Sequence, residues 1–161
     1  MADTFPARPQ ATAEFIERVA RYLEDHGIAR IGGRIYGYLL TQDGPRSLDH
    51  LVAALGASKG SVSLNVRSLA QEDLVERVTV PGDRKDYYSL PAGGATRPLE
   101  LLLTRVEQLN ELYAWGHANG EISSPEARNR LRLTTPFLAH VHQQTTQMLS
   151  EWRRRTRGMG T

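Results

Sequence analysis

The residues with the clearest chemical potential lie between Ser58 and Leu69, in the segment SKGSVSLNVRSL. Val62, Val66 and Leu69 recur at helical spacing, so one face of a helix would be apolar. The other face has small hydroxyls and one arginine, and the segment contains no acidic residue. Hydroxyl and guanidinium groups suit hydrogen bonds to base edges and phosphates. The alternative is an ordinary amphipathic helix with a serine-rich solvated face, so the flanking sequence must decide.

The candidate DNA contacts are the polar or outward positions of this segment, the cap of the preceding helix and the tip of a later turn. They are Ser47, Ser58, Lys59, Gly60, Ser61, Ser63, Leu64, Asn65, Arg67, Ser68, Arg84 and Lys85. We expect Ser58 to cap its helix by accepting a hydrogen bond from a backbone N–H. Asn65 lies near the edge of the apolar face, where a structural hydrogen bond is favoured over a base contact.

The segment before Ser58 predicts a helix-turn-helix unit. Ser47 is expected to cap a short helix that ends at Gly56. In such a unit the second helix enters the major groove, which assigns that role to the helix beginning at Ser58. This recognition helix should end near Asp73, because Asp tolerates the left-handed conformation that a helix end often needs.

From Leu74 the hydrophobic period changes from that of a helix to that of a strand. Alternating valines lead into a turn at residues 81–84, and Lys85 to Leu90 form a returning strand. A hairpin directly after a recognition helix is the wing of a winged helix. Arg84 and Lys85 at its tip are placed to reach a minor groove or phosphates.

Together these motifs resemble the MarR-type winged-helix transcriptional regulators, and more narrowly the GbsR group. The resemblance covers about residues 28–90. It rests on GRIYGYLL at Gly33–Leu40, SKGSVSLNVRSL at Ser58–Leu69 and VPGDRKDYY at Val80–Tyr88. The combination of the three motifs is specific, although each alone is not.

The resemblance implies that Ser58–Arg67 is the recognition helix. It also implies that the Asp83 carboxylate orients the Arg84 side chain in the wing. Two positions depart from the family pattern. Asp73 stands where a glycine is usual, and Pro91–Gly94 replaces a polar helix start.

Two helices are expected before the recognition unit. The first runs from about Thr12 to Asp25, and the second from about Arg30 to Gln42. Three glycines interrupt the second helix, at positions 32, 33 and 37. Glycine in a helix costs about 1 kcal/mol relative to alanine, so another element is expected to pack closely there.

Long helices are also expected after the wing. Apolar residues spaced three and four apart predict one from Pro98 to about His117 and another from Pro125, which Pro136 either kinks or divides. Their apolar edges exceed what one small core covers, which favours a symmetric homodimer over helices that cover only their own core. The basic cluster at Arg153–Arg157 is expected to be a solvated end, with DNA backbone contact as the alternative.

The predicted fold is therefore mainly α with a small β-hairpin wing, a winged helix-turn-helix with flanking dimerisation helices. The expected division is a flexible arm at 1–10, an N-terminal helix packing on the dimer region at 11–27, the winged helix at 28–91, dimerisation helices at 92–157 and a disordered tail at 158–161.

Composition excludes several classes of function. The chain has 161 residues and no cysteine, which excludes Cys-ligated zinc and thiol chemistry. No phosphate loop, nucleophile elbow or metal-ligand spacing is present, so neither an enzyme nor a cofactor nor a metal site is expected. No segment approaches the roughly 18 apolar residues needed to cross a bilayer, and a cytoplasmic protein is expected. The net charge is only +2, so a nucleic-acid footprint must come from geometry.

The leading hypothesis is a homodimeric, sequence-specific regulator of transcription that binds double-stranded DNA. The alternative is a winged-helix module that binds protein instead. The family resemblance also permits a small-molecule effector, and the GbsR group suggests a quaternary ammonium compound. Aromatic faces for such a cation would come from Tyr36, Tyr38, Tyr113, Trp115 and Trp152, although core packing is the favoured role for these residues.

Overall fold

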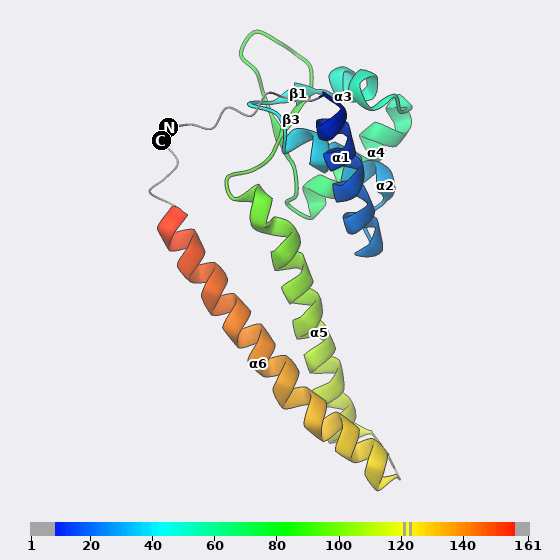
Figure 1. Cartoon of the computed structure of the whole chain (residues 1–161), viewed down its shortest axis with the longest axis vertical. Coiled ribbons are helices and arrows are strands. Elements are labelled where there is room, and N and C mark those ends of the chain that lie inside the picture. The colour runs from blue at the N-terminus through cyan, green and yellow to red at the C-terminus, as the bar shows by residue number, and fades with distance from the viewer. Residues whose placement is uncertain (1–8, 121, 123, 157–161) are drawn as a thin grey trace. The chain divides into compact units, whose positions relative to one another are not determined.

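The computed structural model describes residues 9–120, 122 and 124–156, and it divides the chain into two compact units (Figure 1). Unit 1 ends at Pro98, and unit 2 begins at Leu99. The described residues are mostly helical, with one small antiparallel sheet. The predicted mainly α fold with a β wing is confirmed. Residues 1–8 of the predicted arm and the predicted tail at 158–161 lie outside the described residues.

Unit 1 contains the winged helix and the helix before it. Its elements are α1 (Pro9–Asp25), α2 (Arg30–Leu39), β1 (Arg46–Ser47), α3 (Leu48–Leu55), α4 (Lys59–Gln71), β2 (Glu76–Val78), β3 (Tyr87–Ser89) and the short 3-10 helix η1 (Gly94–Thr96). α1 begins three residues before the predicted start, so the last two residues of the expected arm are helical. Its expected packing on a dimer region stays a prediction.

The glycines of α2 allow two neighbouring helices to approach it closely. A Cβ atom on Gly33 would lie 2.7 Å from the Cα of Ala20 in α1, and Gly37 also meets α1. On the other side, a Cβ on Gly32 would lie 3.3 Å from Oδ1 of Asn65 in α4. The close packing predicted from these glycines is confirmed.

The core of unit 1 joins α2, α3 and α4 to the chain that follows α4. Its largest fully buried side chains are Ile35, Leu51, Val62, Val66, Leu74 and Val75. Burial of an aliphatic side chain of this size contributes about 1.5–3 kcal/mol. This shared core fixes the orientation of α4 relative to the rest of unit 1.

The sheet has the order β1-β3-β2, with β3 at its centre. Tyr88 of β3 lies opposite Arg46 of β1 on one side and Arg77 of β2 on the other. The sequence did not predict β1, whose two residues form a strand only through this pairing. The predicted strand from Lys85 to Leu90 is too long, because pairing is confined to Tyr87–Ser89.

Unit 2 consists of two long helices, α5 (Arg97–Asn119), which begins in unit 1, and α6 (Pro125–Thr156). His142 of α6 lies 3.4 Å from Glu107 of α5, measured from Nε2 to Oε2. α6 continues through Pro136, so the second helix that the sequence allowed to start there does not form. Among the described residues, no helix is long and apolar enough to cross a membrane.

Candidate nucleic-acid interface

The recognition helix predicted from the sequence is α4, and its start is fixed by a side-chain cap. Ser58 has an extended backbone conformation, and its hydroxyl accepts a hydrogen bond of 3.2 Å from the N–H of Ser61. Ser47 caps α3 in the same way by accepting from the N–H of His50, and Gly56 ends α3 in the left-handed conformation. The predicted caps of both helices are confirmed.

The two faces of α4 differ sharply in burial. Val62, Val66 and Leu69 are buried in the core of unit 1. By contrast, the Leu64 side chain is 64% exposed. Most of the candidate contacts on α4 are exposed or half-buried, namely Ser58, Lys59, Gly60, Ser61, Ser63, Asn65, Arg67 and Ser68. The apolar residues therefore attach the helix to its unit and leave the polar face to solvent.

The two cations of this segment already have partners within unit 1. Lys59 Nζ lies 2.8 Å from Asp49 Oδ1 and so links α4 to α3, and this hydrogen bond lowers the pKa of Asp49. Arg67 donates from Nε to the Ser63 carbonyl oxygen at 3.1 Å. A phosphate contact by either cation would have to compete with these internal hydrogen bonds.

Asn65 is half-buried at the contact between α4 and α2. Its side-chain amide donates to the carbonyl oxygen of Ser61 at 2.9 Å, and its Oδ1 faces Gly32. This arrangement agrees with the structural role that the sequence favoured for Asn65. A base contact would require the amide to leave that hydrogen bond.

The wing turns at residues 80–83. The N–H of Asp83 donates to the Val80 carbonyl oxygen at 3.1 Å, and Gly82 has a φ of +83°. A proline followed by a glycine with positive φ is typical of a type II turn. Arg84 and Lys85 are exposed directly after this turn, which lies one residue earlier than the sequence predicted.

Asp83 braces the wing from inside. Its carboxylate accepts from the N–H of Lys85 at 3.0 Å and from the hydroxyl of Tyr87 at 2.8 Å. These hydrogen bonds lower the pKa of Asp83, and the one to Tyr87 raises the pKa of that phenol. The family resemblance implied that Asp83 orients the Arg84 guanidinium, whereas the hydrogen bonds of this carboxylate shape the backbone of the turn.

The sequence missed one ion pair in the wing. Arg77 of β2 pairs with Asp86, which lies just before β3. The alternating pattern identified both strand regions, but it gave no register that would place these two side chains together. The pair braces the base of the wing.

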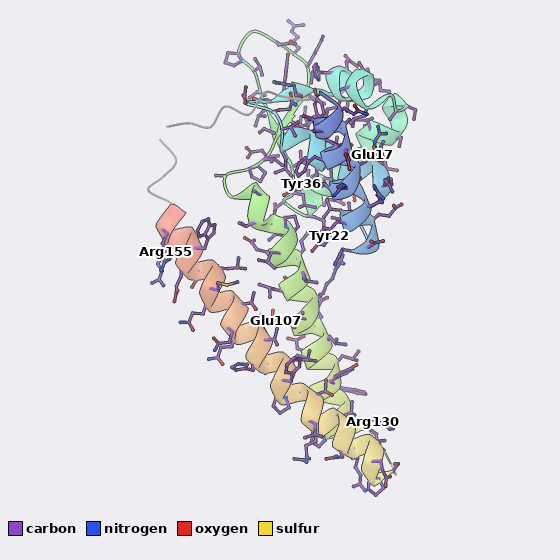
Figure 2. The ribbon with its side chains drawn as sticks, in the orientation of Figure 1. Glu17, Tyr22, Tyr36, Glu107, Arg130 and Arg155 are labelled. Carbon is purple, nitrogen blue, oxygen red and sulfur yellow. The ribbon has the colours of Figure 1, made fainter. Side chains whose placement is uncertain are left out.

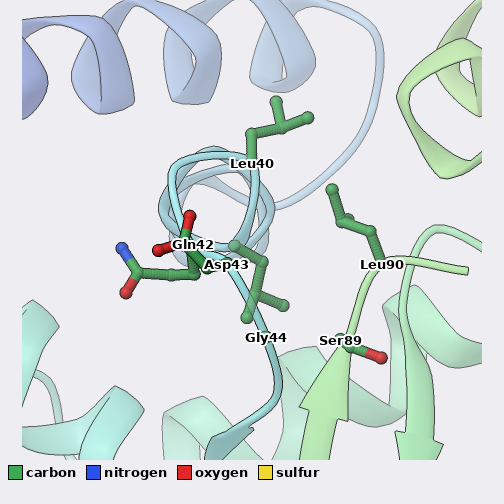
Figure 3. Close-up of a pocket in the computed structure, with 7 residues that line it drawn as sticks. Leu40, Gln42, Asp43, Gly44, Ser89 and Leu90 are labelled. Atoms are coloured by element: carbon green, nitrogen blue, oxygen red, sulfur yellow. The ribbon is translucent and has the colours of Figure 1, made fainter.

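Unit 1 also contains a small cavity of about 190 Å³ where α2 and β3 end (Figure 3). Its lining residues are Leu39, Leu40, Gln42, Asp43, Gly44, Ser89 and Leu90. None of the five aromatic residues considered for an effector lines this cavity. Of those, Tyr36 is buried in the core, as expected. Trp115 and Trp152 are 63% and 51% exposed, so the prediction that they pack in the core is wrong within a single chain.

Comparison with known proteins identifies the class. The HTH-type transcriptional regulator MmpR5 of Mycobacterium tuberculosis is 32% identical over 145 residues, which cover 89% of this chain and 87% of that protein. The chain belongs to the HTH-type transcriptional regulators. The HTH-type transcriptional repressor OpcR of Bacillus subtilis is 28% identical over 145 residues, covering 88% of this chain and 76% of that protein.

A solved structure agrees with this assignment. A crystal structure of a transcriptional regulator matches with a TM-score of 0.73 and 29% identity, covering 89% of this regulator and 99% of that chain. No protein-family model matches the sequence. The predicted class, a DNA-binding regulator of transcription and not an enzyme, is confirmed. The narrower GbsR group stays a prediction.

Proposed function

We propose that this HTH-type regulator binds a specific double-stranded DNA site as a homodimer, with α4 in the major groove and the wing beside it. The observation that carries the proposal is the division of α4 into a buried apolar face and an outward face without acidic residues. The stable attachment of one face leaves the other available for contacts that do not disturb the fold.

The outward face of α4 suits close approach to base edges. Nothing lies within 4 Å of a Cβ atom added to Gly60, and Ser61 and Ser63 are short. Leu64 is apolar yet mostly exposed, which suits contact with a thymine methyl group. These residues occupy the first turns of α4, from which base contacts mostly come in this geometry.

Arg67 lies in the second half of α4, so we assign it a phosphate contact in preference to a base contact. Arg84 and Lys85 of the wing would then reach a minor groove or phosphates beside the site. Phosphate contacts position a protein on DNA without reading its sequence. Specificity is therefore assigned to the first two turns of α4, and much of the affinity to the cations around it.

The homodimer is proposed from the exposed apolar side chains of unit 2. They are Leu99, Leu109, Leu112, Trp115, Leu133, Phe137, Met148 and Trp152. So large an apolar surface marks an interaction site, and a second copy of the same chain would cover it with matching helices. A dimer would also join two recognition helices for two half-sites.

A small effector is a further part of the proposal. The cavity at the ends of α2 and β3 is the candidate site in unit 1, and it has both leucine and polar lining residues. Its volume of about 190 Å³ lies below the 300–1,000 Å³ or so of ordinary ligand pockets. Only a small compound would fit without rearrangement.

The proposed function is tested by selecting bound fragments from genomic DNA with the purified full-length protein. The selected duplex and its single-base variants are then titrated at two salt concentrations. DNA binding must weaken as salt rises, because neutralised phosphates release counterions. Absence of a salt-dependent, sequence-dependent complex would overturn the proposal.

The same titration separates the two roles of Arg67. With a phosphate contact, Arg67→Ala reduces affinity almost uniformly across sequences and makes the salt slope shallower. With a base contact, it costs about 1–3 kcal/mol on the preferred duplex and flattens the preference at one base pair in each half-site. Thermal melting of the variant provides the control for folding.

A further inference from the structure

We infer that Arg97 is a positioning residue for DNA binding, because it ties the end of α4 to the first residue of α5. The inference rests on the proposed function, in which α4 contacts DNA and the helices of unit 2 form the dimer. No sequence motif singled out Arg97. Its importance follows from contacts that it makes within unit 1.

Arg97 binds two groups at the end of α4. Its Nε donates to the Glu72 carbonyl oxygen at 2.8 Å, and its Nη2 lies 3.2 Å from the Asp73 carboxylate. The last carbonyls of a helix lack partners within the helix and carry partial negative charge. A guanidinium satisfies such an end well, because its donors form a rigid fork. The Arg97 side chain is 28% exposed but the Asp73 side chain is 76% exposed, so water screens this ion pair, and the hydrogen bond to Glu72 carries more of the attachment.

The end of α4 has a fixed shape at this point. Asp73 has a φ of +54°, and the N–H of Leu74 donates back to the Leu69 carbonyl oxygen at 2.9 Å. Leu74 itself is fully buried. The groups that Arg97 binds therefore move together with α4.

The connection that leads into α5 is held at a second point. The hydroxyl of Tyr36 in α2 donates to the Gly94 carbonyl oxygen at 2.9 Å, and Figure 2 shows the Tyr36 side chain within unit 1. Burial raises the pKa of Tyr36 to about 12. Gly94 is buried, and a Cβ atom added to it would lie 2.9 Å from Cδ of Pro91.

Residues 94–97 are thus fixed to α2 by Tyr36 and to α4 by Arg97. α5 is one continuous helix whose first residue is Arg97. In a dimer built by α5 and α6, this connection would set the separation and the tilt of the two copies of α4. Without Arg97, the dimer should therefore accept a wider range of half-site spacings. The affinity of each α4 for its own half-site should change less.

The test uses full-length protein and the duplex recovered by genomic selection. The central spacer is lengthened or shortened by one and two base pairs, and one further duplex has a single half-site scrambled. Five variants are compared with the wild type: Arg97→Ala, Arg97→Lys, Asp73→Asn, the double variant Arg97→Ala/Asp73→Asn and the control Arg21→Ala. Arg21 is exposed on α1, so its replacement changes the net charge equally. Asn at position 73 keeps a residue type that tolerates positive φ.

For the wild type, the dissociation constant should rise on shifted spacers. In Arg97→Ala, the ratio of the dissociation constant on a shifted spacer to that on the optimal spacer should fall about fivefold or more. Fivefold is the lower end of measured coupling between two sites. Arg97→Lys should restore this ratio only in part, because the lysine ammonium keeps the positive charge but lacks the rigid fork of donors. Asp73→Asn alone should lower this ratio less than Arg97→Ala does. In the double variant, Asp73→Asn should lower it less than it does in the wild type. Arg21→Ala should retain the wild-type ratio.

Two results overturn the inference while leaving the proposed function intact. One is a wild-type spacing profile in a folded, dimeric Arg97→Ala variant. The other is an equal loss of affinity on every spacer, which would mean that Arg97 only stabilises the fold. If the wild type itself lacks salt-dependent binding to the selected duplex, the proposed function fails, and the inference fails with it.

Discussion

The exposed cations of unit 1 differ in the internal hydrogen bonds that a DNA contact would have to break. Lys59 is held by Asp49, and Arg67 donates to the backbone of its own helix. Arg84 follows a turn whose backbone Asp83 already braces. The turn therefore presents Arg84 in a defined place, and the described hydrogen bonds of the Asp83 carboxylate go to Lys85 and Tyr87.

Arg84→Ala is expected to weaken DNA binding across many sequences and to make the salt slope shallower by about one unit. The reason is the loss of one phosphate or minor-groove contact that carries little sequence information. Titration against several duplexes at a series of salt concentrations measures both effects. Arg21→Ala removes the same charge from the outer surface of α1 and should leave the slope unchanged. An unaltered slope and affinity in Arg84→Ala would remove the wing from the DNA contact.

At the scale of elements, the contact between α1 and α2 depends on glycine. The Cβ that Gly33→Ala adds would lie 2.7 Å from a backbone atom of Ala20, so one helix must shift. Overpacking of this kind costs about 1–3 kcal/mol, and urea unfolding of the full chain should show a loss of that size.

Gly60→Ala provides the matched control for this prediction. Gly60 is also helical, but a Cβ there meets nothing within 4 Å. The substitution should therefore stabilise the fold by up to about 1 kcal/mol, because glycine loses more backbone entropy on folding. Equal effects of the two substitutions would contradict the packing explanation. Because Gly60 faces the proposed groove, Gly60→Ala should also weaken DNA binding despite the more stable fold.

An ion cluster also joins α1 to α2, and it predicts a pH dependence. Glu17 of α1 lies 2.8 Å from Arg30 and 2.7 Å from Arg34. The hydrogen bond from Arg30, together with the charge of Arg34, lowers the pKa of Glu17. A carboxylate with a lowered pKa stabilises the fold above its unfolded-state pKa, and this contribution disappears as the pH falls through the folded-state value.

Glu17→Gln should therefore destabilise the chain at pH 7 by up to about 1 kcal/mol, because partly exposed ion pairs contribute little. The difference from the wild type should shrink as the pH falls below the ordinary glutamate range. Urea unfolding at several pH values measures it. Glu14→Gln is the control, because among the described residues Glu14 pairs only with Arg18, which is exposed on the same helix. A difference that persists at low pH would indicate lost packing instead of lost charge.

The elements also show which features could be predicted from the sequence. The Ser58 cap and the positive φ of Asp73 were predictable, because each depends on residues within one turn of the chain. β1 was not, because two residues become a strand only by pairing with β3, some forty positions later. The contact of Arg97 with Glu72 likewise joins distant residues, and no spacing rule identifies it. The cap and the buried face of α4 were therefore predictable, whereas the long-range contacts with β1 and Arg97 were not.

At the scale of the whole molecule, the two units differ in how completely they bury their apolar side chains. The core of unit 1 has several fully buried aliphatic residues, whereas Leu103 and Leu149 are the buried hydrophobic residues described in unit 2. Two long helices with so many exposed leucine and aromatic side chains would not be stable in water by packing on each other alone. This contrast favours assembly with a second chain.

Joint replacement of Leu112 and Phe137 by glutamate is expected to convert the dimer into a monomer. Both side chains are mostly exposed in a single chain, so the winged helix should keep its melting transition. The dimer should be lost, because burying a carboxylate at an interface has a large desolvation cost. Sedimentation equilibrium measures the mass of the particle. Titration with the selected duplex should show a loss of affinity of about 100-fold or more, because the two copies of α4 are no longer joined in one molecule. Gln144→Glu, an exposed change on α6, should leave both properties unaltered. A monomeric wild type at micromolar concentration, or a double variant that still dimerises, would show that these apolar faces of α5 and α6 do not form the interface.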